Sequence, residues 1–453
     1  MKMESQVIKK EEETYQAAFQ SLQERTASIS PGWIQRLRES AMDRFDQLGF
    51  PSVKEEDWKY TNVAPISRIR FDPITSSLPE PTGSLTANEV SLFGYVEAGT
   101  SQLVFENGVL RKELSSLSGL AGVIAIDLAQ AIDDEQHGEL IRKHLARGAD
   151  HNVNGFTAMN TAMFPSGAFV LIPKGAVIES PLHLLFIANP AQSPVATFPR
   201  VLILAEENSQ ATIIETYVGL KESEYLTTAV VEVVLEDGAR LEHYKVQRES
   251  VEAFHIATTS AELGSNSSYD TTTINFGAQL CRHDVKVVMA HEGAECWVDG
   301  LYVTGDGQHT DTHSVIDHQK PHCTSHQLYK GILDGKSRAV FNGKVFVRHD
   351  AQKTDAMQTN KNLLLSNEAR VDTKPQLEIL ADDVKCAHGA AVGQIDADEL
   401  FYLETRGIHH DLAKNLLTYG FAEEVIGKIK VESIRAQLDE AVLNRIQARL
   451  EVP

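Results

Sequence analysis

Cys386 and His388 are the pair of residues in this sequence best suited to metal chemistry. They lie in the run from Asp382 to Ala390, which reads DDVKCAHGA. In an extended strand alternate residues share a face, so Cys386 and His388 would be neighbours on a face that also carries Val384. A thiolate beside an imidazole can bind iron or zinc. Because C-x-H occurs in many unrelated strands, spacing alone leaves a functional pair and plain core packing equally open.

A second candidate site is the stretch 308–326, which holds five of the chain's 17 histidines. On a strand, His309, Asp311 and His313 would share a face, and this is a composition that suits a hard-to-borderline metal ion. The structural alternative is a polar ladder, in which aligned side chains of stacked strands hydrogen-bond to one another. The spacing matches no closed metal motif, so we favour the ladder.

The other residues that could carry chemistry are better explained by structural roles. The four cysteines include no CxxC and are widely spaced, which favours reduced thiols over a disulfide framework or zinc ribbon. The sequence has no phosphate-binding glycine loop, no G-x-S-x-G and no HExxH, so an ATPase, an α/β-hydrolase or a zincin is not indicated. An amide-rich group is interpreted as hydrogen-bonded ladders and comprises Asn342, Gln352, Asp355, Gln358, Asn360, Asn362 and Asn367.

Net charge and hydropathy limit the classes of protein to which this chain can belong. Asp plus Glu number 63 against 42 Lys plus Arg, a formal net charge of −21 that opposes nucleic acid or an anionic membrane as the main partner. No run approaches the roughly 18 to 20 apolar residues of a membrane span. The first residues, MKMESQVIKKEEETYQ, lack the apolar core of a secretion signal, and their glutamates oppose a transit peptide. We expect a cytoplasmic protein.

Three regions would position the candidate residues. Residues 1–155 combine helical periodicity, broken at Ser30-Pro31-Gly32, with an irregular Pro- and Gly-rich connection. Residues 156–395 consist of short runs rich in Val, Ile and Thr, which predict strands. Residues 396–453 return to helical periodicity.

The β region carries recurring turn residues, which suggest stacked coils. Asn or Gly falls in similar turns at 208, 238, 266, 293, 335 and 367, with successive gaps of 30, 28, 27, 42 and 32 residues. This spacing is near that of one coil in a solenoid. We therefore predict a parallel β-helix, with a β-sandwich as the alternative.

The C-terminal region is predicted to form three helices. Asp396 looks like an N-cap with Glu399 three residues on, and Gly407 ends this helix. The last helix carries an apolar stripe, formed by Ile434, Leu438, Val442, Ile446 and Leu450. We favour packing of this stripe within the chain over docking on another protein.

Several ordered segments resemble the SufB/SufD family of iron–sulfur cluster assembly proteins. The resemblance covers roughly residues 150–430, and the segments that carry it are Asp355–Gln358, Asn362–Ser366, Pro375–Ile379, Ala381–Gly389, Leu400–Leu403 and Arg406–Ile408. The N-terminal region, which ends in Glu56-Asp57-Trp58-Lys59-Tyr60-Thr61 and lacks a CxxC, is more similar to the SufD branch than to the SufB branch.

The resemblance implies a right-handed parallel β-helix between helical N- and C-terminal regions. It implies a complex in which the chain contacts a SufB-like subunit through the β-helix and a SufC-like ATPase through the C-terminal helices. The family's Cys-x-His matches Cys386 and His388, at an interface where a nascent cluster is built. His388 is then the better ligand candidate, with Cys386 in a supporting role.

The expected function is therefore a non-enzymatic scaffold subunit, with ATP hydrolysis supplied by a partner. The alternative is a metal-dependent enzyme on a β-helix that uses the histidines of 309–326. The sequence leaves open the cluster type and its full ligand set, any part played by flavin, and whether the isolated chain forms a homodimer.

Overall fold

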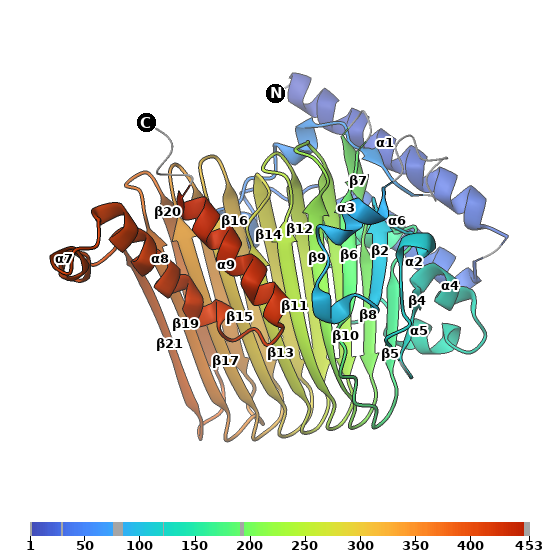
Figure 1. Ribbon diagram of the computed structural model, residues 1–453. Helices are drawn as coiled ribbons and strands as arrows, with labels where there is room; N and C mark the ends of the chain where they lie inside the picture. The colour runs from blue at the N-terminus through green and yellow to red at the C-terminus, as the bar shows by residue number, and fades with distance from the viewer. Residues whose placement is uncertain (1, 29, 76–84, 121, 191–193, 448–453) are drawn as a thin grey trace.

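The computed structural model describes residues 2–28, 30–75, 85–120, 122–190 and 194–447 of the 453. Its centre is a parallel β-helix, seen in Figure 1 as two facing sheets whose strands run side by side. From β8 (Arg200–Ala205) to β21 (Lys385–Gly393) successive strands alternate between the sheets, so each strand pairs in parallel with the strand two places along the chain. The predicted mainly β fold with helical ends is confirmed.

The strands of the two sheets are as follows. Sheet A contains β4 (Ile124–Asp127), β5 (Ala168–Ile172), β8 (Arg200–Ala205), β10 (Leu226–Leu235), β12 (Phe254–Leu263), β14 (Leu280–Met289), β16 (His309–His318), β18 (Arg338–Val347) and β20 (Arg370–Ile379), with β1 (Asp72–Pro73) and β7 (Val195–Thr197) at its margin. Sheet B contains β3 (Val109–Leu110), β2 (Gln102–Glu106), β6 (Leu182–Ala188), β9 (Gln210–Gly219), β11 (Arg240–Arg248), β13 (Ser268–Asn275), β15 (Glu295–Thr304), β17 (Thr324–Leu333), β19 (Asp355–Leu364) and β21 (Lys385–Gly393).

The helices lie outside the coils. The N-terminal part of the chain forms α1 (Lys2–Thr26), α2 (Gly32–Leu48), α3 (Ala87–Ser91), α4 (Leu128–Asp133), α5 (Gly138–His144) and α6 (Gly155–Met163), with 3-10 turns η1 (Glu56–Trp58), η2 (Ile66–Arg68), η3 (Val96–Ala98) and η4 (Lys112–Leu114). The C-terminal part forms α7 (Ala397–Thr405), α8 (His410–Ile426) and α9 (Glu432–Gln447). No helix among the described residues is long and apolar enough to cross a membrane.

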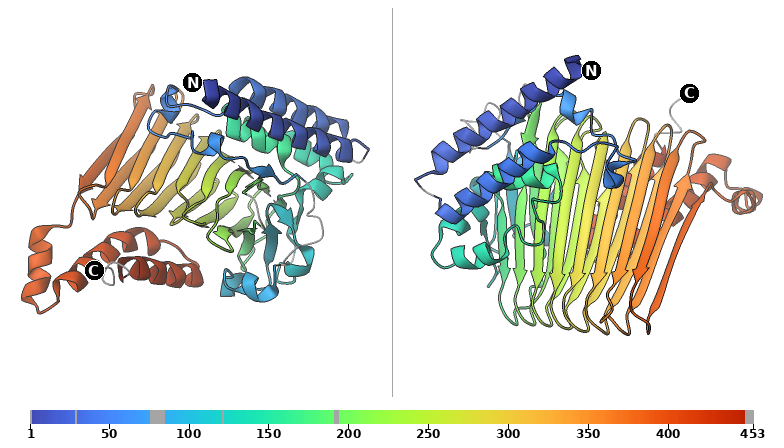
Figure 2. Two further views of the ribbon diagram at one scale, coloured as in Figure 1. Left: turned by 90° about the horizontal axis from the view of Figure 1, so that it is seen from above. Right: turned by 180° about the vertical axis from the view of Figure 1, so that it is seen from behind.

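Three apolar layers hold these parts together. Alternate strand residues fill the lumen between the sheets, for example Val231, Val287 and Tyr302. The outer face of sheet A packs on α2 and α6, and the outer face of sheet B packs on α8 and α9. Figure 2 shows the two helical groups on opposite sides of the β-helix. Burial on both faces explains the nearly continuous apolar runs of strands such as β8 and β10.

The apolar stripe of the last helix faces this chain's own sheet B. Ile434, Leu438 and Val442 are buried against residues such as Val246 and Leu301. The favoured internal packing is therefore confirmed for these three residues, because they are covered and cannot dock a partner. The Ile446 side chain and Leu450 lie outside the described residues.

The turn residues used to predict the coils belong to two different corners. Asn208, Gly238, Asn266 and Gly293 lead from sheet A to sheet B, and all have positive φ. His322 and Lys353 continue this corner, also with positive φ. Gly335 and Asn367 lie at the opposite corner. The gap of 42 residues therefore spans two corners, and the true spacing along the first corner stays close to 30 residues.

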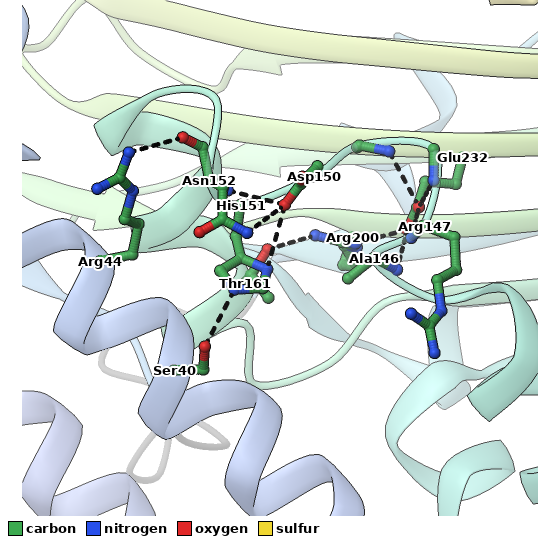
Figure 3. A network of polar contacts seen from close by, with 12 residues as sticks. Ser40, Arg44, Ala146, Arg147, Asp150, His151, Asn152, Thr161, Arg200 and Glu232 are labelled. Carbon is green, nitrogen blue, oxygen red and sulfur yellow. Dashed lines mark hydrogen bonds and ion pairs between the residues drawn. The ribbon is translucent and has the colours of Figure 1, made fainter.

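A buried carboxylate joins the N-terminal part of the chain to the coils (Figure 3). Glu232 accepts hydrogen bonds from four successive backbone N–H groups, those of residues 146–149, at 2.8 to 3.2 Å. Its other strong contact is with Arg200, 2.5 Å away, and both side chains are at most 2% exposed. The Glu232 carboxylate thus anchors the connection between α5 and α6 to strand β10, and Arg200 compensates its charge.

The two ends of the β-helix differ. Every residue of β5 and β6 is buried, whereas no residue of β21 is. β21 pairs only with β19, and β20 only with β18, so each presents an unpaired edge. The C-terminal end is open, and the candidate pair lies on it.

Candidate cluster-assembly site at the open end

Strand register places Cys386 and His388 on the lumen side of the last coil. Cys386 lies opposite Ala356 and His388 opposite Gln358 on β19. Ala356 and Gln358 are buried in the lumen, but no further coil covers their counterparts, so Cys386 is half-buried and His388 is exposed. The shared face expected from strand geometry is observed, and it opens to the outside.

The two side chains have different environments. Burial raises the pKa of the Cys386 thiol, and the nearby Asp355 carboxylate raises this pKa further. The thiol must therefore lose a proton when it binds a metal. His388 is exposed, and its ring makes no hydrogen bond to the described residues, so the imidazole is not committed to a partner within the chain. These environments suit His388 as a ligand and Cys386 as a supporting group.

Exposed apolar residues surround the pair. Ile379, Leu380 and Val392 are 39%, 56% and 46% exposed. Together with the unpaired edges of β20 and β21 they form an apolar surface with free backbone hydrogen-bonding groups. Such edges usually need a cover in native proteins.

Cys386 and His388 do not complete a metal site by themselves. Among the described residues, no group of three or more His, Cys, Asp or Glu side chains is placed to hold a metal ion. The chain would thus supply at most two ligands at this end, and a tetrahedral site needs four.

The histidines of 309–326 are spread over four environments. His309 and His313 lie on the outer face of sheet A, whereas His318 lies in the lumen and contacts the Ser325 hydroxyl at 2.8 Å. His322 occupies an exposed corner, and the His326 ring stacks on Trp297 with 5.9 Å between centroids. They do not form one site.

The predicted shared face of His309, Asp311 and His313 is observed, and it anchors the N-terminal segment. The Thr61 hydroxyl donates to Asp311, and His309 Nε2 lies 3.0 Å from the same hydroxyl. Arg282 donates to Asp311 and lies over the ring of Trp58, 3.8 Å from its centroid. These contacts give the three residues a structural role, which the sequence analysis favoured over a metal site.

The lumen contains an ionisable cluster that the sequence analysis missed. Lys245 Nζ and Glu249 Oε2 each lie 2.7 Å from opposite nitrogens of His255, and all three residues are at most 5% exposed. Burial, followed by the charge of Lys245, lowers the pKa of His255, so a neutral ring can accept a hydrogen bond from Lys245 at Nε2 while Nδ1 faces the Glu249 carboxylate. Glu215 and His243 form a second buried pair at 2.7 Å. The only sequence signal is a polar residue at alternate positions of a buried strand.

Comparison with known proteins agrees with this architecture. A family model described as the SUF system FeS cluster assembly SufBD core domain matches residues 186–421, and one described as the SufBD protein N-terminal region matches residues 9–184. An iron–sulfur cluster assembly SufBD family protein of Synechocystis is 35% identical over 413 residues, 89% of each chain.

Two relatives carry the name iron–sulfur cluster assembly protein SufD. That of Escherichia coli is 31% identical over 410 residues, 89% of this chain and 90% of the relative. That of Bacillus subtilis is 27% identical over 442 residues, 92% of this chain and 95% of the relative. Since the core model matches residues 186–421, more than half of the chain, and the Synechocystis relative is 35% identical over 89% of it, the chain belongs to the SufBD family of iron–sulfur cluster assembly proteins.

Proposed function

We propose that this chain is the SufD-type scaffold subunit of an iron–sulfur cluster assembly complex. It binds a SufB-like subunit through the open end of the β-helix and a SufC-like ATPase through its C-terminal helices. The observation that carries this proposal is the position of Cys386 and His388 on a coil that is uncovered and offers two unpaired strand edges.

A second β-helix is the partner that fits the open end. Its terminal coil would pair with the free edge of β20 or β21 and cover Ile379 and Val392. The same contact would bring further ligands to Cys386 and His388. The nascent cluster is then cargo held between two subunits, with His388 as a ligand and Cys386 in support.

The ATPase partner fits a different surface. α7 projects from the body of the molecule in Figures 1 and 2 and has no buried residue. Phe401 and Tyr402 on α7 are 66% and 56% exposed, and Leu412 and Leu416 on α8 are 53% and 44% exposed. We name these four residues the α7–α8 patch. This patch is exposed and the stripe of α9 is buried, so we assign ATPase docking to the patch.

The alternative, a metal-dependent enzyme, would need the histidines of 309–326 to converge. They occupy separate environments, and Asp311, the carboxylate nearest to two of them, is already bonded to Arg282 and Thr61. The scaffold is the function that this arrangement favours.

Co-expression with a SufB-like partner tests the proposal. Val392→Asp places a charge at the open end and should abolish co-purification of the partner. Met357→Asp is the matched control, because Met357 is 47% exposed but lies on β19 facing away from the lumen, and it should leave pairing intact. Equal pairing of both variants would contradict the proposal.

A further inference from the structure

A cavity of about 620 Å³ lies on the outer face of sheet B, beside the connection between α8 and α9. Its floor is formed by residues near the start of β9, β11, β13 and β15, and its wall by Lys428 and Lys430. This volume is within the range of small-molecule sites, about 300 to 1,000 Å³. Neither Cys386 nor His388 lines the cavity, so it is separate from the proposed cluster site.

The two lysines of the wall are already paired with carboxylates of the floor. Lys428 donates to Asp299 at 2.7 Å, and Lys430 bonds Glu242. The backbone N–H of Lys430 also donates to the Tyr244 hydroxyl, at 3.1 Å. These contacts hold the wall against the sheet and compensate the charge of two floor carboxylates, so the lysines do not make this an anion site.

A third carboxylate of the floor, that of Asp270, lacks a counter-ion. Asp270 lies beside Glu242 in strand register and is half-buried. Its side chain makes no hydrogen bond or ion pair with the part of the chain that the structure describes. Burial raises its pKa to about 6; Lys430 and Lys428 oppose this shift, and the carboxylates of Asp299 and Glu242 add to it. A half-buried carboxylate without a partner favours a ligand that brings a positive charge.

The indole ring of Trp297 adds an aromatic face beside this carboxylate. Trp297 is the register partner of His326 on β17, and their rings are nearly parallel, with 18° between the planes and 5.9 Å between the centroids. Because His326 covers the face turned toward β17, the other face is turned toward β13, where Asp270 is the register partner of Trp297. The stack on His326 is the only ring or cation contact of Trp297 within the described residues. The carboxylate and the uncovered aromatic face are thus about one strand spacing apart, ~4.8 Å.

The chemistry of these two groups selects the class of ligand. A bare metal ion does not fit, because within the described ranges no three His, Cys, Asp or Glu side chains are placed to hold one. A planar guanidinium fits best, since it can stack on an indole face and bond a carboxylate through two parallel N–H groups. An ammonium group can bond the carboxylate, but it lacks the planar shape that stacks on the ring.

We propose that this cavity binds a guanidinium group, stacked on Trp297 and paired with Asp270. The group can belong to a free compound or to an arginine side chain of another protein, because the recognised chemistry is the same. Arg240 and Glu295 at the rim are exposed, so the cavity is accessible from solvent. Binding places a positive charge beside the one floor carboxylate that the wall lysines leave unpaired.

NMR of the indole N–H groups tests the site in the isolated full-length chain, without partner or iron. The chain has three tryptophans, so Trp297→Phe assigns the signal of interest and the other two serve as internal controls. N-acetyl-arginine amide should shift the Trp297 signal and bind at least about tenfold more tightly than its citrulline analogue, which has the same shape without the charge. The lysine analogue should bind with intermediate affinity. Equal affinities for the arginine and citrulline compounds would overturn the proposal.

Variants assign the binding to the two groups. Asp270→Asn removes the charge with little change in shape, and it should abolish the preference for arginine over citrulline. Trp297→Leu should weaken binding at least about threefold in isothermal titration, because the aromatic face is lost. Glu262→Gln is the matched control, since it changes the net charge equally at an exposed position on sheet A, and it should bind normally. Equal weakening by Asp270→Asn and Glu262→Gln would show a diffuse charge effect and overturn the proposal.

Free L-arginine distinguishes the two sources of the group. It carries its own ammonium and carboxylate, which an arginine within a protein chain lacks. Tighter binding of free arginine than of N-acetyl-arginine amide would support the proposal with a small molecule as the ligand, and weaker binding would support it with a partner's side chain. No shift of the Trp297 signal with either compound would overturn it.

Discussion

The Thr61 hydroxyl donates a 2.5 Å hydrogen bond to the carboxylate of Asp311, a residue 250 positions further along the chain. Arg282 strengthens the same contact, because its guanidinium bonds Asp311 and covers the ring of Trp58. The segment around Trp58 thus acts as a brace across β14 and β16. The polar face formed by His309, Asp311 and His313 serves to hold this brace.

Replacing Asp311 should weaken the brace. Asp311→Asn leaves the buried Arg282 with reduced charge compensation, and removing one partner of a buried ion pair typically costs about 3 to 5 kcal/mol. Urea unfolding at pH 7 measures this loss. Asp372→Asn, at a mostly exposed pair with Arg338, should change the unfolding free energy by less than about 1 kcal/mol.

The Asp311 contribution should also depend on pH. Burial raises the pKa of this carboxyl, but Arg282 and His313, with hydrogen bonds from His313 and Thr61, outweigh burial and hold the pKa well below its usual range. A depressed folded-state pKa gives stability that is present above the unfolded value of about 3.9 and is lost as the pH falls below it. The wild-type advantage over Asp311→Asn should therefore shrink below pH 4. A constant difference between pH 7 and pH 3 would contradict this assignment.

The coils were predictable because they depend on local turn chemistry. Asn208, Gly238, Asn266 and Gly293 adopt the positive φ that Asn and Gly tolerate, so residue type reveals them. His322 and Lys353 occupy the same corner with the same sign of φ, and their residue types give no such signal. The regular spacing was therefore hidden until the structure showed which turns share a corner.

Glu232 should be among the most sensitive polar positions in the chain. Glu232→Gln removes the negative charge that compensates Arg200 and replaces one acceptor oxygen with an NH2 group that faces backbone N–H donors. We expect a loss of about 3 to 5 kcal/mol in the free energy of unfolding. Glu262→Gln, an exposed carboxylate on the next strand of sheet A, should change it by less than about 0.5 kcal/mol. If the two substitutions lowered the free energy of unfolding by similar amounts, the contact of Glu232 with the backbone of residues 146–149 would not be an anchor.

The α7–α8 patch should bind the ATPase partner. Phe401→Asp should weaken binding at least about tenfold, or 1.4 kcal/mol, because exposed aromatic residues are common anchors of interfaces. The melting temperature should not change, since α7 has no buried residue. Val96→Asp, at a residue that is 89% exposed elsewhere, is the control and should bind normally.

A deletion of the C-terminal helices would not test ATPase docking alone, because it would also destabilise the β-helix. α8 and α9 cover Tyr244, Ile274 and Leu301 of sheet B, so their removal exposes apolar core. Leu438→Asp should likewise lower the melting temperature. If Leu438→Asp abolished ATPase binding at unchanged stability while Phe401→Asp bound normally, the docking surface would be α9 and not the patch.

The candidate pair was predictable only in part. Alternation in a strand places Cys386 and His388 on one face in any β structure. The helical periodicity from residue 396 predicts that β21 belongs to the last coil, but it does not predict that α7 leaves this face uncovered. A structural role was favoured for the histidines of 309–326, but their separation was not predictable, because a corner at His322 sends neighbours in sequence to opposite sheets.

His388 should matter for cluster assembly and not for folding. In the complex co-expressed with its partners, His388→Ala should lower iron and sulfide content, because it removes an imidazole donor that neither Val392 nor Ala390 on the same face can replace. Cys386→Ser should have a smaller effect, since burial raises the pKa of the thiol and favours a supporting role. His349→Ala is the matched control, an exposed corner histidine with an 81% exposed side chain. All three variants should keep the wild-type melting temperature. Normal iron and sulfide content in His388→Ala, or a larger loss in Cys386→Ser, would reverse the roles assigned to the two residues.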